Sequence, residues 1–221
     1  MDIYQKAREN MVECQLKPDG VSNPEILEAY LTIPREIFVP AHRKDVAYID
    51  EDIMFDDGRF LLEPSTHGRM VQALNLGKDE AVLNVGCATG YSAAILSSLA
   101  KTVISTSNSS EAIEAAKKNC EALGLYNVVF FYEENIQNGC PEYAPFRAMI
   151  FNGAIPFLPE NILNNLATDG RIVYIERPSG SPIGRAILLQ KLESGAFSKI
   201  ALFDAATPYL PGYRPEEEFS F

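Results

Sequence analysis

The sequence has no tryptophan, only two histidines and four cysteines, and no long apolar run. The cysteines, at positions 14, 87, 120 and 140, form no Cys-x-x-Cys pair and have no histidine cluster, which argues against a zinc site and a disulfide framework. The longest apolar stretches, such as 128–132 and 144–151, are too short to cross a bilayer. We therefore expect no metal site, reduced thiols and no membrane partner.

Positive charge is also scarce, with 19 Lys and Arg against 30 Asp and Glu, a net charge of −11. No stretch gathers a basic cluster with interleaved aromatic residues, and an acidic chain repels polyphosphate, so no nucleic-acid partner is expected. The first residues have neither the basic start nor the apolar core of a signal peptide, which predicts a cytoplasmic location. The 47% of hydrophobic residues is typical of a globular protein with one core.

The first part of the chain, residues 1–64, predicts an N-terminal helical cap and substrate-side segment. An amphipathic pattern predicts a helix over 3–16, and proline in a first turn begins another over 24–32. Residues 38–62 have no clean period, which predicts an irregular segment with short strands that cross toward a site, with a turn at Gly58.

The second part, residues 65–221, alternates helix and strand in the way that builds a parallel sheet covered on both faces. Helices are expected over 66–74, 92–99, 111–123 and 159–166. Strands are expected over 81–85, 102–106, 128–132, 148–151 and 171–175, the last after a turn at Asp169 and Gly170, with a closing antiparallel pair over 185–192 and 199–203. The sequence predicts an α/β fold with a doubly wound, mostly parallel seven-stranded sheet.

Residues 82–91 form an apolar run that ends in a glycine-bounded turn and opens into a helix. Gly86 and Gly90 allow the backbone to approach a ligand closely, and backbone N–H groups point at whatever lies above such a turn. Position 88 is alanine and the third glycine of a dinucleotide-binding motif is missing, which disfavours a nicotinamide cofactor. The pattern predicts a cradle for another cofactor.

Polar residues follow four of the predicted strands. They are 86–91, Ser107 with Asn108, 133–135 and 152–154. Because ligands in open α/β sheets collect outside the carboxyl ends of the strands, these loops are expected to line one crevice. A cofactor of the adenosine type would lie across it, with its ribose near the second strand end.

Several motifs together resemble the protein-L-isoaspartate O-methyltransferase family, a branch of the class I methyltransferases with a Rossmann-like fold. The most distinctive is the string from Ile33 to Pro40, which contains Pro-Arg-Glu-x-Phe-Val-Pro. Further matching segments are Arg8, Met11-Val12, Gln15, Ala47-Tyr48, 86–91, 139–141, 144–146 and 159–173. The resemblance covers almost the whole chain.

This resemblance implies an enzyme that uses S-adenosyl-L-methionine to methylate the carboxylate of isoaspartyl residues in damaged proteins, acting as a monomer. It makes 65–221 the cofactor-binding domain and places the substrate groove at Leu62, Glu63, Pro64 and Ser65. The cofactor-binding residues that it implies are Asn84, Gly86, Cys87, Ala88, Thr89, Gly90, Tyr91, Ser107, Asn108, Glu134, Asn135 and Asn152. It assigns no certain catalytic residue.

The chain departs from the family's pattern at several positions. The family carries acids where this chain has Asn84 and Ser107, and glycine where it has Ala88. The family's Gly-Asp-Gly aligns with 134–136, and its Ile-Ser/Thr-x-Pro element aligns with 61–64, which leaves no hydroxyl at Leu62. Loss of the ribose-binding carboxylate is expected to cost about 1.5–3 kcal/mol of cofactor binding. Ala88 costs little if its φ is negative and more if it is positive.

The chemistry implied by the resemblance needs no general base, because the acceptor carboxylate is already ionised at neutral pH. Two alternatives stay open: a catalytically weakened or inactive protein of this fold that acts as a binding or scaffold module, and a methyltransferase with another acceptor. A side chain of Glu133 or Glu134 in the crevice beside Ser107 would favour catalysis. An apolar side chain in the adenine slot would favour the binding module.

Overall fold

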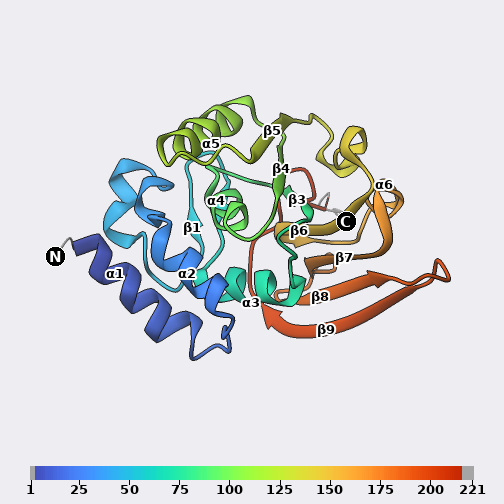
Figure 1. Ribbon diagram of the computed structural model, residues 1–221, viewed down its shortest axis with the longest axis horizontal. Coiled ribbons are helices and arrows are strands. Elements are labelled where there is room, and N and C mark those ends of the chain that lie inside the picture. The colour runs from blue at the N-terminus through green and yellow to red at the C-terminus, as the bar shows by residue number, and fades with distance from the viewer. Residues whose placement is uncertain (1–2, 216–221) are drawn as a thin grey trace, which may run out of the picture.

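The computed structural model describes residues 3–215 and is built around a seven-stranded sheet (Figure 1). The strands follow the order β5-β4-β3-β6-β7-β8-β9 across the sheet. Their bounds are β3 Ala81–Val85, β4 Thr102–Ser107, β5 Val128–Tyr132, β6 Phe146–Ile155, β7 Leu166–Glu176, β8 Gly184–Lys191 and β9 Phe197–Ala205. The predicted fold class is confirmed.

Parallel pairing runs from β5 to β7, and β8 and β9 add the antiparallel pair that the sequence predicts. Strand β3 lies between β4 and β6, because the chain builds β4 and β5 on one side and then crosses to the other. The carboxyl ends of β3 and β6 therefore meet at the point where the strand order reverses. Such a point opens a crevice in an α/β sheet.

Helices cover the sheet and form the N-terminal part of the molecule (Figure 1). Asn23 caps α2 by accepting from the backbone N–H groups of Glu25 and Ile26, and Ser109 caps α5 by accepting from Ala112 N–H. The α-helices are α1 Ile3–Met11, α2 Pro24–Thr32, α3 Pro64–Leu74, α4 Tyr91–Ser97, α5 Ser110–Ala122 and α6 Glu160–Asn164. A π-helical turn, Val12–Leu16, continues α1, and 3₁₀ turns occupy 35–37, 41–46, 136–138 and 141–143.

Two predicted boundaries around β7 are wrong. The helix expected to reach residue 166 ends at Asn164, because Leu166 is buried and pairs with Phe146 as the first residue of β7. The turn expected at Asp169 lies inside β7, where the register shifts between the Phe146 and Ala148 pairings. An irregularity within a strand absorbs extra residues without ending the strand.

A small hairpin brings the irregular N-terminal segment to the sheet. Strands β1, Ile53–Met54, and β2, Phe60–Leu61, pair antiparallel around a turn in which Gly58 has φ +79°. Phe60 and Leu61 are buried, so β2 packs into the body of the protein. Among the described residues, no helix is both long and apolar enough to cross a membrane.

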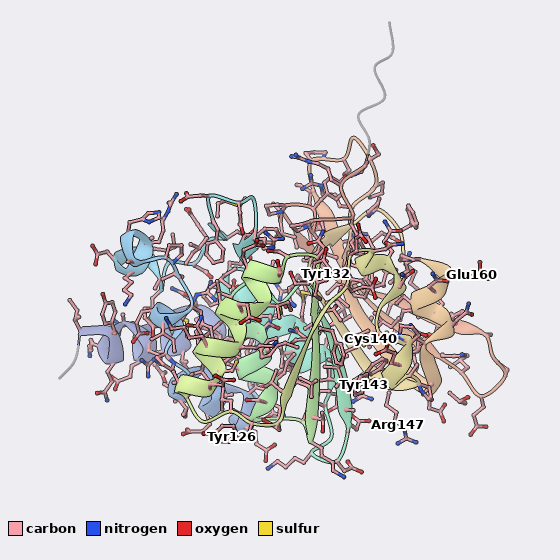
Figure 2. The ribbon with its side chains drawn as sticks, turned by 90° about the horizontal axis from the view of Figure 1, so that it is seen from above. Tyr126, Tyr132, Cys140, Tyr143, Arg147 and Glu160 are labelled. Atoms are coloured by element: carbon pink, nitrogen blue, oxygen red, sulfur yellow. The ribbon has the colours of Figure 1, made fainter. Side chains whose placement is uncertain are left out.

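Strand β5 forms one edge of the sheet, with β9 at the other, and it presents aromatic side chains. Tyr126 and Tyr132 lie near the two ends of β5 and are exposed (Figure 2). Phe131 packs against Tyr143 with ring centroids 4.9 Å apart. The 3₁₀ turn that carries Tyr143 therefore covers part of this edge.

Candidate active site

The glycine loop joins β3 to α4 and is fixed to the neighbouring strand. The backbone N–H groups of Gly86 and Cys87 both donate to the Thr106 carbonyl of β4, and Gly90 N–H donates to Cys87 O. Gly86 and Gly90 have φ of +79° and +98°. A Cβ on Gly90 would lie 3.1 Å from Ala116 of α5, so glycine permits both this conformation and this close packing.

Ala88 lies in the same loop with φ +42°, in the left-handed region. For a residue with a Cβ this conformation costs about 1–2 kcal/mol. The sequence leaves the sign of φ at position 88 open. The structure has the positive φ, which is the more costly of the two for alanine.

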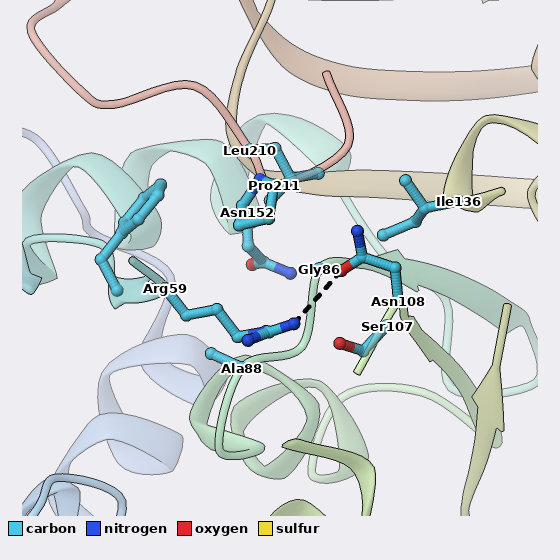
Figure 3. Close-up of a pocket in the computed structure, with 10 residues that line it drawn as sticks. Arg59, Gly86, Ala88, Ser107, Asn108, Ile136, Asn152, Leu210 and Pro211 are labelled. Atoms are coloured by element: carbon cyan, nitrogen blue, oxygen red, sulfur yellow. Dashed lines mark hydrogen bonds between the residues drawn. The ribbon is translucent and has the colours of Figure 1, made fainter. Parts of the chain in front are cut away.

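The loop forms one side of a small pocket at the carboxyl ends of the strands, here named the strand-end pocket (Figure 3). Arg59 extends across it, donating to Asn108 Oδ1 at 3.3 Å and pairing with Asp57 at 2.8 Å. The described residues that line the pocket are Arg59, Phe60, Gly86, Ala88, Ser107, Asn108, Ile136, Asn152, Leu210 and Pro211.

A second small pocket lies on the side of α3. It shares Phe60, Gly86, Ala88 and Asn152 with the strand-end pocket, and its other lining residues are Leu61, Leu62, His67, Cys87, Tyr91 and Ser92. Since Phe60 is only 4% exposed and lines both spaces, its ring contributes to the boundary between them.

The C-terminal segment 207–213 closes the crevice from above. Leu210 N–H donates to Ala154 O, and Ala154 N–H donates to Pro208 O, so the segment runs beside β6. A Cβ built on Gly86 would lie 2.3 Å from a methyl carbon of Leu210, and Tyr213 packs edge-on against Phe151. Leu210 and Tyr213 are buried, so this segment is part of the core.

Beneath the loop, a chain of buried hydrogen bonds links the helical cap to the sheet. The Ser92 hydroxyl and the Asn152 amide both donate to Asn84 Oδ1 at 2.8 Å, and the Asn84 amide donates to Ser105 at 2.9 Å. His67 Nε2 lies 2.9 Å from Ser92 Oγ, and its Nδ1 contacts the Tyr30 hydroxyl. Because the Ser92 proton goes to Asn84, His67 carries its proton on Nε2 and accepts at Nδ1 from Tyr30.

Burial keeps this chain of groups neutral. Desolvation lowers the pKa of His67 to about 3, with a further lowering from the nearby Arg35 charge. Burial also raises the pKa of the Cys87 thiol to about 12. At neutral pH, His67 is therefore not an imidazolium acid and Cys87 is not a thiolate nucleophile. No cluster of three or more His, Cys, Asp or Glu suited to a metal ion occurs among residues 3–215.

Comparisons with known proteins agree with this architecture. The family model described as Protein-L-isoaspartate(D-aspartate) O-methyltransferase (PCMT) matches residues 6–196. The chain belongs to this family. A protein-L-isoaspartate O-methyltransferase 2 from Pelobacter propionicus is 34% identical over 185 residues, which cover 84% of this chain and 79% of that protein. One from Protochlamydia amoebophila is 36% identical over 169 residues, or 76% and 80% of the two chains.

Solved structures of the isoaspartyl methyltransferase family share the fold. One structure named protein-L-isoaspartate O-methyltransferase has a TM-score of 0.81 at 28% identity, and the match covers 91% of this chain and 65% of that one. A Plasmodium falciparum structure in complex with S-adenosyl-L-homocysteine has a TM-score of 0.75 at 17% identity and covers 96% and 100%. The family is one of S-adenosylmethionine-dependent enzymes.

The structure brings together some of the residues that the resemblance implies. Gly86, Ala88, Ser107, Asn108 and Asn152 line the strand-end pocket, and Leu62, Cys87 and Tyr91 line the second one. Others lie elsewhere, in positions with structural partners. They are Asn84 in the buried chain of hydrogen bonds, Thr89 donating to Phe38 O, Gly90 packed on Ala116, Glu63, Pro64 and Ser65 at the start of α3, Glu134, and Asn135 capping a 3₁₀ turn.

Among residues 3–215, no acid lines the strand-end pocket in place of the carboxylate that is missing at Ser107. Glu133 accepts from the Asn135 backbone and the Asn138 amide, outside the strand-end pocket, and Glu134 is exposed. Ser65 and Thr66 do not cap α3, which begins at Pro64 with Glu63 as its N-cap; the Thr66 hydroxyl donates to the Glu63 side chain. The ribose end of the site therefore offers hydroxyl and amide groups in place of a carboxylate.

The sequence did not single out several residues that shape the two pockets. They are Arg59, Phe60, His67, Ser92, Leu210 and Pro211. The segment 38–62 was expected to cross toward a site, and Arg59 and Phe60 lie in it. Leu210 had no signal of its own, because it lies beyond the last predicted strand, in a stretch with no periodic pattern.

The backbone of the loop suits S-adenosylmethionine, the family's cofactor, whereas the side chains at the end where the ribose would lie suit it less well. The buried, unpartnered Oδ1 of Asn152 offers one hydrogen-bond acceptor beside the loop. At the ribose end, Ser107 and Asn108 offer no carboxylate, and Leu210 occupies space over Gly86. The residues present fit the amino-acid part of S-adenosylmethionine better than its ribose.

Proposed function

We propose that this chain transfers a methyl group from S-adenosylmethionine to the carboxylate of isoaspartyl residues in damaged proteins. One observation carries this proposal: Gly86, Ser107 and Asn152, from three adjacent strands, line a single pocket, with Gly86 and Ser107 at strand ends and Asn152 just past the last pairing of β6 with β3. The names of the relatives, which share about a third of their residues with this chain, support the same activity. The proposal includes action as a monomer in the cytoplasm, without nucleic-acid or membrane partners.

In this proposal the loop 86–91 holds the amino-acid part of the cofactor through backbone groups, and Ser107 and Asn108 lie beside the ribose. Asn152 Oδ1 is a buried acceptor without a partner, which suits the cofactor's ammonium group. The cofactor, when bound, supplies an electrophilic methyl group. Since none of the described residues that line this end of the pocket carries a carboxylate, we expect the cofactor affinity to be lower than an acid bound to the ribose hydroxyls would give.

The acceptor side lies at 62–65. Arg35 is fully buried, donates to Leu62 O at 2.7 Å, and lies 4.7 Å from the centre of the Tyr91 ring. It thereby holds the groove segment against the helix that follows the loop. An isoaspartyl carboxylate is ionised at neutral pH, so the chain has to align it and need not remove a proton.

The direct test is methyl transfer to a matched pair of peptides that differ only in one isoaspartyl or aspartyl residue. Incorporation into the isoaspartyl peptide alone, measured by mass spectrometry, is the expected result. A Leu62→Ser variant, which restores a hydroxyl to the groove, is expected to turn over faster. No incorporation at saturating cofactor, with both variants folded, would reject the activity.

A second candidate function is a non-catalytic binding protein that keeps the fold. It is favoured by Phe60 and Leu210, two buried apolar side chains that take up space in the crevice. A Cβ on Gly153 would lie only 2.8 Å from the Phe60 ring, so little free volume lies between β6 and β2. Binding of the product S-adenosylhomocysteine without any methyl transfer would support this candidate.

A further inference from the structure

The side-chain amide of Asn152 belongs to the lining of both pockets. Its Nδ2 donates to Asn84 Oδ1 at 2.8 Å and to the backbone carbonyl oxygen of Val85 at 3.0 Å, which uses both of its hydrogens. Its Oδ1 is buried and has no hydrogen-bond partner among the described residues. Asn152 therefore offers a ligand one acceptor and no donor.

The orientation of this amide follows from the chemistry of its partners. The carbonyl oxygen of Val85 can only accept, so the atom of Asn152 that faces it is the nitrogen. The second hydrogen of that nitrogen needs an oxygen on Asn84, whose own amide nitrogen donates to Ser105 Oγ at 2.9 Å. Turning either amide by 180° would bring two donors or two acceptors face to face. Each amide thus holds the other in place.

Asn84 is also held from the side of the helices. The Ser92 hydroxyl of α4 donates to Asn84 Oδ1 at 2.8 Å, and His67 Nε2 of α3 lies 2.9 Å from Ser92 Oγ. Because His67 donates to the Ser92 oxygen, the Ser92 proton is left for Asn84. Asn84 is fully buried, so bulk water does not compete for these bonds. Two helices therefore fix Asn84, and Asn84 fixes Asn152.

The free oxygen of Asn152 determines which chemical group suits this place. A buried acceptor without a partner favours a donor from the ligand, and a cationic donor forms the stronger hydrogen bond. None of the described residues that line the two pockets carries a carboxylate. A positive charge is therefore recognised here by oriented dipoles, among them the Asn152 carbonyl.

We propose that Asn84 is a positioning residue for the ammonium group of the cofactor. It does not contact the cofactor, because it lines neither pocket, but it holds Asn152 with Oδ1 free to accept from the ammonium group. This inference rests on the proposed function, since it takes the ammonium group of S-adenosylmethionine as the partner of Asn152. It replaces the direct cofactor contact that the resemblance implies for Asn84.

The experiment is calorimetric titration of the full chain with S-adenosylhomocysteine and with its analogue in which hydrogen replaces the ammonium group. The unchanged chain should bind S-adenosylhomocysteine about tenfold or more tightly than the analogue. Asn84→Leu should reduce this ratio to below about threefold, with the affinity for the analogue nearly unchanged. A merely structural role of Asn84 would weaken both ligands equally and leave the ratio as it was.

Two matched variants keep the contact between positions 84 and 152. Asn84→Asp still accepts from Ser92 and Asn152, so it should preserve the ratio of the unchanged chain. Ser105→Ala removes the other hydrogen bond of Asn84 without removing a contact of Asn152, and should preserve it too. Asn84→Ala has the same expected result as Asn84→Leu with less bulk, and replaces it if Asn84→Leu does not fold.

Two results would overturn this inference alone: a ratio that survives in folded Asn84→Leu or Asn84→Ala, or equal affinities of the unchanged chain for the two ligands. Both leave binding of S-adenosylhomocysteine intact, so the proposed methyl transfer would stand. The expected ratios without methyl transfer to the isoaspartyl peptide would reject the proposed function and support this inference. No binding of either ligand by folded protein would overturn both.

Discussion

The two walls of the strand-end pocket differ in origin and in chemistry. The strand-end wall, Gly86, Ala88, Ser107, Asn108 and Asn152, is built by backbone that parallel strands place at one edge of the sheet. The covering wall comes from two segments outside the sheet, one that precedes its first strand in the sequence and one that follows its last. Its residues are Arg59, Phe60, Leu210 and Pro211. The first wall follows from the fold. The second wall decides how much room a ligand has and which charge it meets.

The largest expected effect comes from breaking the covering wall at Leu210. Leu210→Ala removes a buried side chain that contacts Gly86 and Gly153, and should lower the free energy of unfolding by about 2–4 kcal/mol. Urea unfolding measures the change. Ile200→Ala, at a half-exposed position of β9, is the control and should cost less than about 1 kcal/mol. Equal losses in the two variants would show that Leu210 is not packed into the site.

The buried chain of hydrogen bonds beneath the strand-end wall should make stability depend on pH through His67. The unfolded imidazole has a pKa near 6.5 and the folded one about 3, so stability is fully present above pH 6.5 and falls as protons bind the unfolded state. Between pH 7 and pH 5 this contribution drops by about 2 kcal/mol. Urea unfolding at both pH values measures the drop in the free energy of unfolding, and the drop should be smaller in His67→Gln than in the unchanged chain.

His42→Gln is the matched control for this pH dependence, because His42 is exposed. It should keep the pH dependence of the unchanged chain. A loss of pH dependence in His42→Gln, or its persistence in His67→Gln, would contradict a buried neutral His67.

Placing an acid at position 107, as the family's pattern has it, tests whether the strand-end wall binds the ribose. Ser107→Glu supplies two acceptor oxygens for ribose hydroxyls and is expected to tighten binding of S-adenosylhomocysteine about tenfold. Ser107→Gln adds similar bulk without charge and should give little gain. Unchanged affinity in Ser107→Glu would mean that the ribose does not lie at this strand end.

The smallest expected effect concerns the backbone of the strand-end wall. Ala88→Gly relieves a left-handed conformation at φ +42° and should raise the free energy of unfolding by about 1 kcal/mol. Ala73→Gly in α3, a helix with ordinary backbone, should instead lower it by about 1 kcal/mol. A destabilised Ala88→Gly variant would show that the loop carries no strain at this position.

Much of the fold was predictable because periodicity and turn chemistry act locally. Strands β3 and β5 and helix α2 begin and end where their patterns predict. The end of α6 was not predictable, since the pairing of Leu166 with Phe146 draws that residue into β7. A distant strand decided that boundary.

The site divides in the same way. Gly86 and Ser107 were predictable as strand-end residues, because parallel strands bring their carboxyl ends to one edge. The expected end of the strand at residue 151 was wrong, because β6 continues to Ile155 and Asn152 lies within it, just past the last pairing with β3. Asn84 lies in β3, the strand that precedes the loop, yet its side chain accepts from Ser92 and donates to Ser105 beneath the loop. Leu210 reaches Gly86 only through tertiary packing, so no local pattern could place it there.

The account is tested most directly by titrating the unmodified chain with S-adenosylhomocysteine in a calorimeter. This product of the proposed reaction binds only if the two walls still leave a usable cofactor site. We predict saturable binding with a dissociation constant in the micromolar range. No detectable binding at millimolar concentration by folded protein would contradict the proposed function and leave the binding-module alternative as the better account.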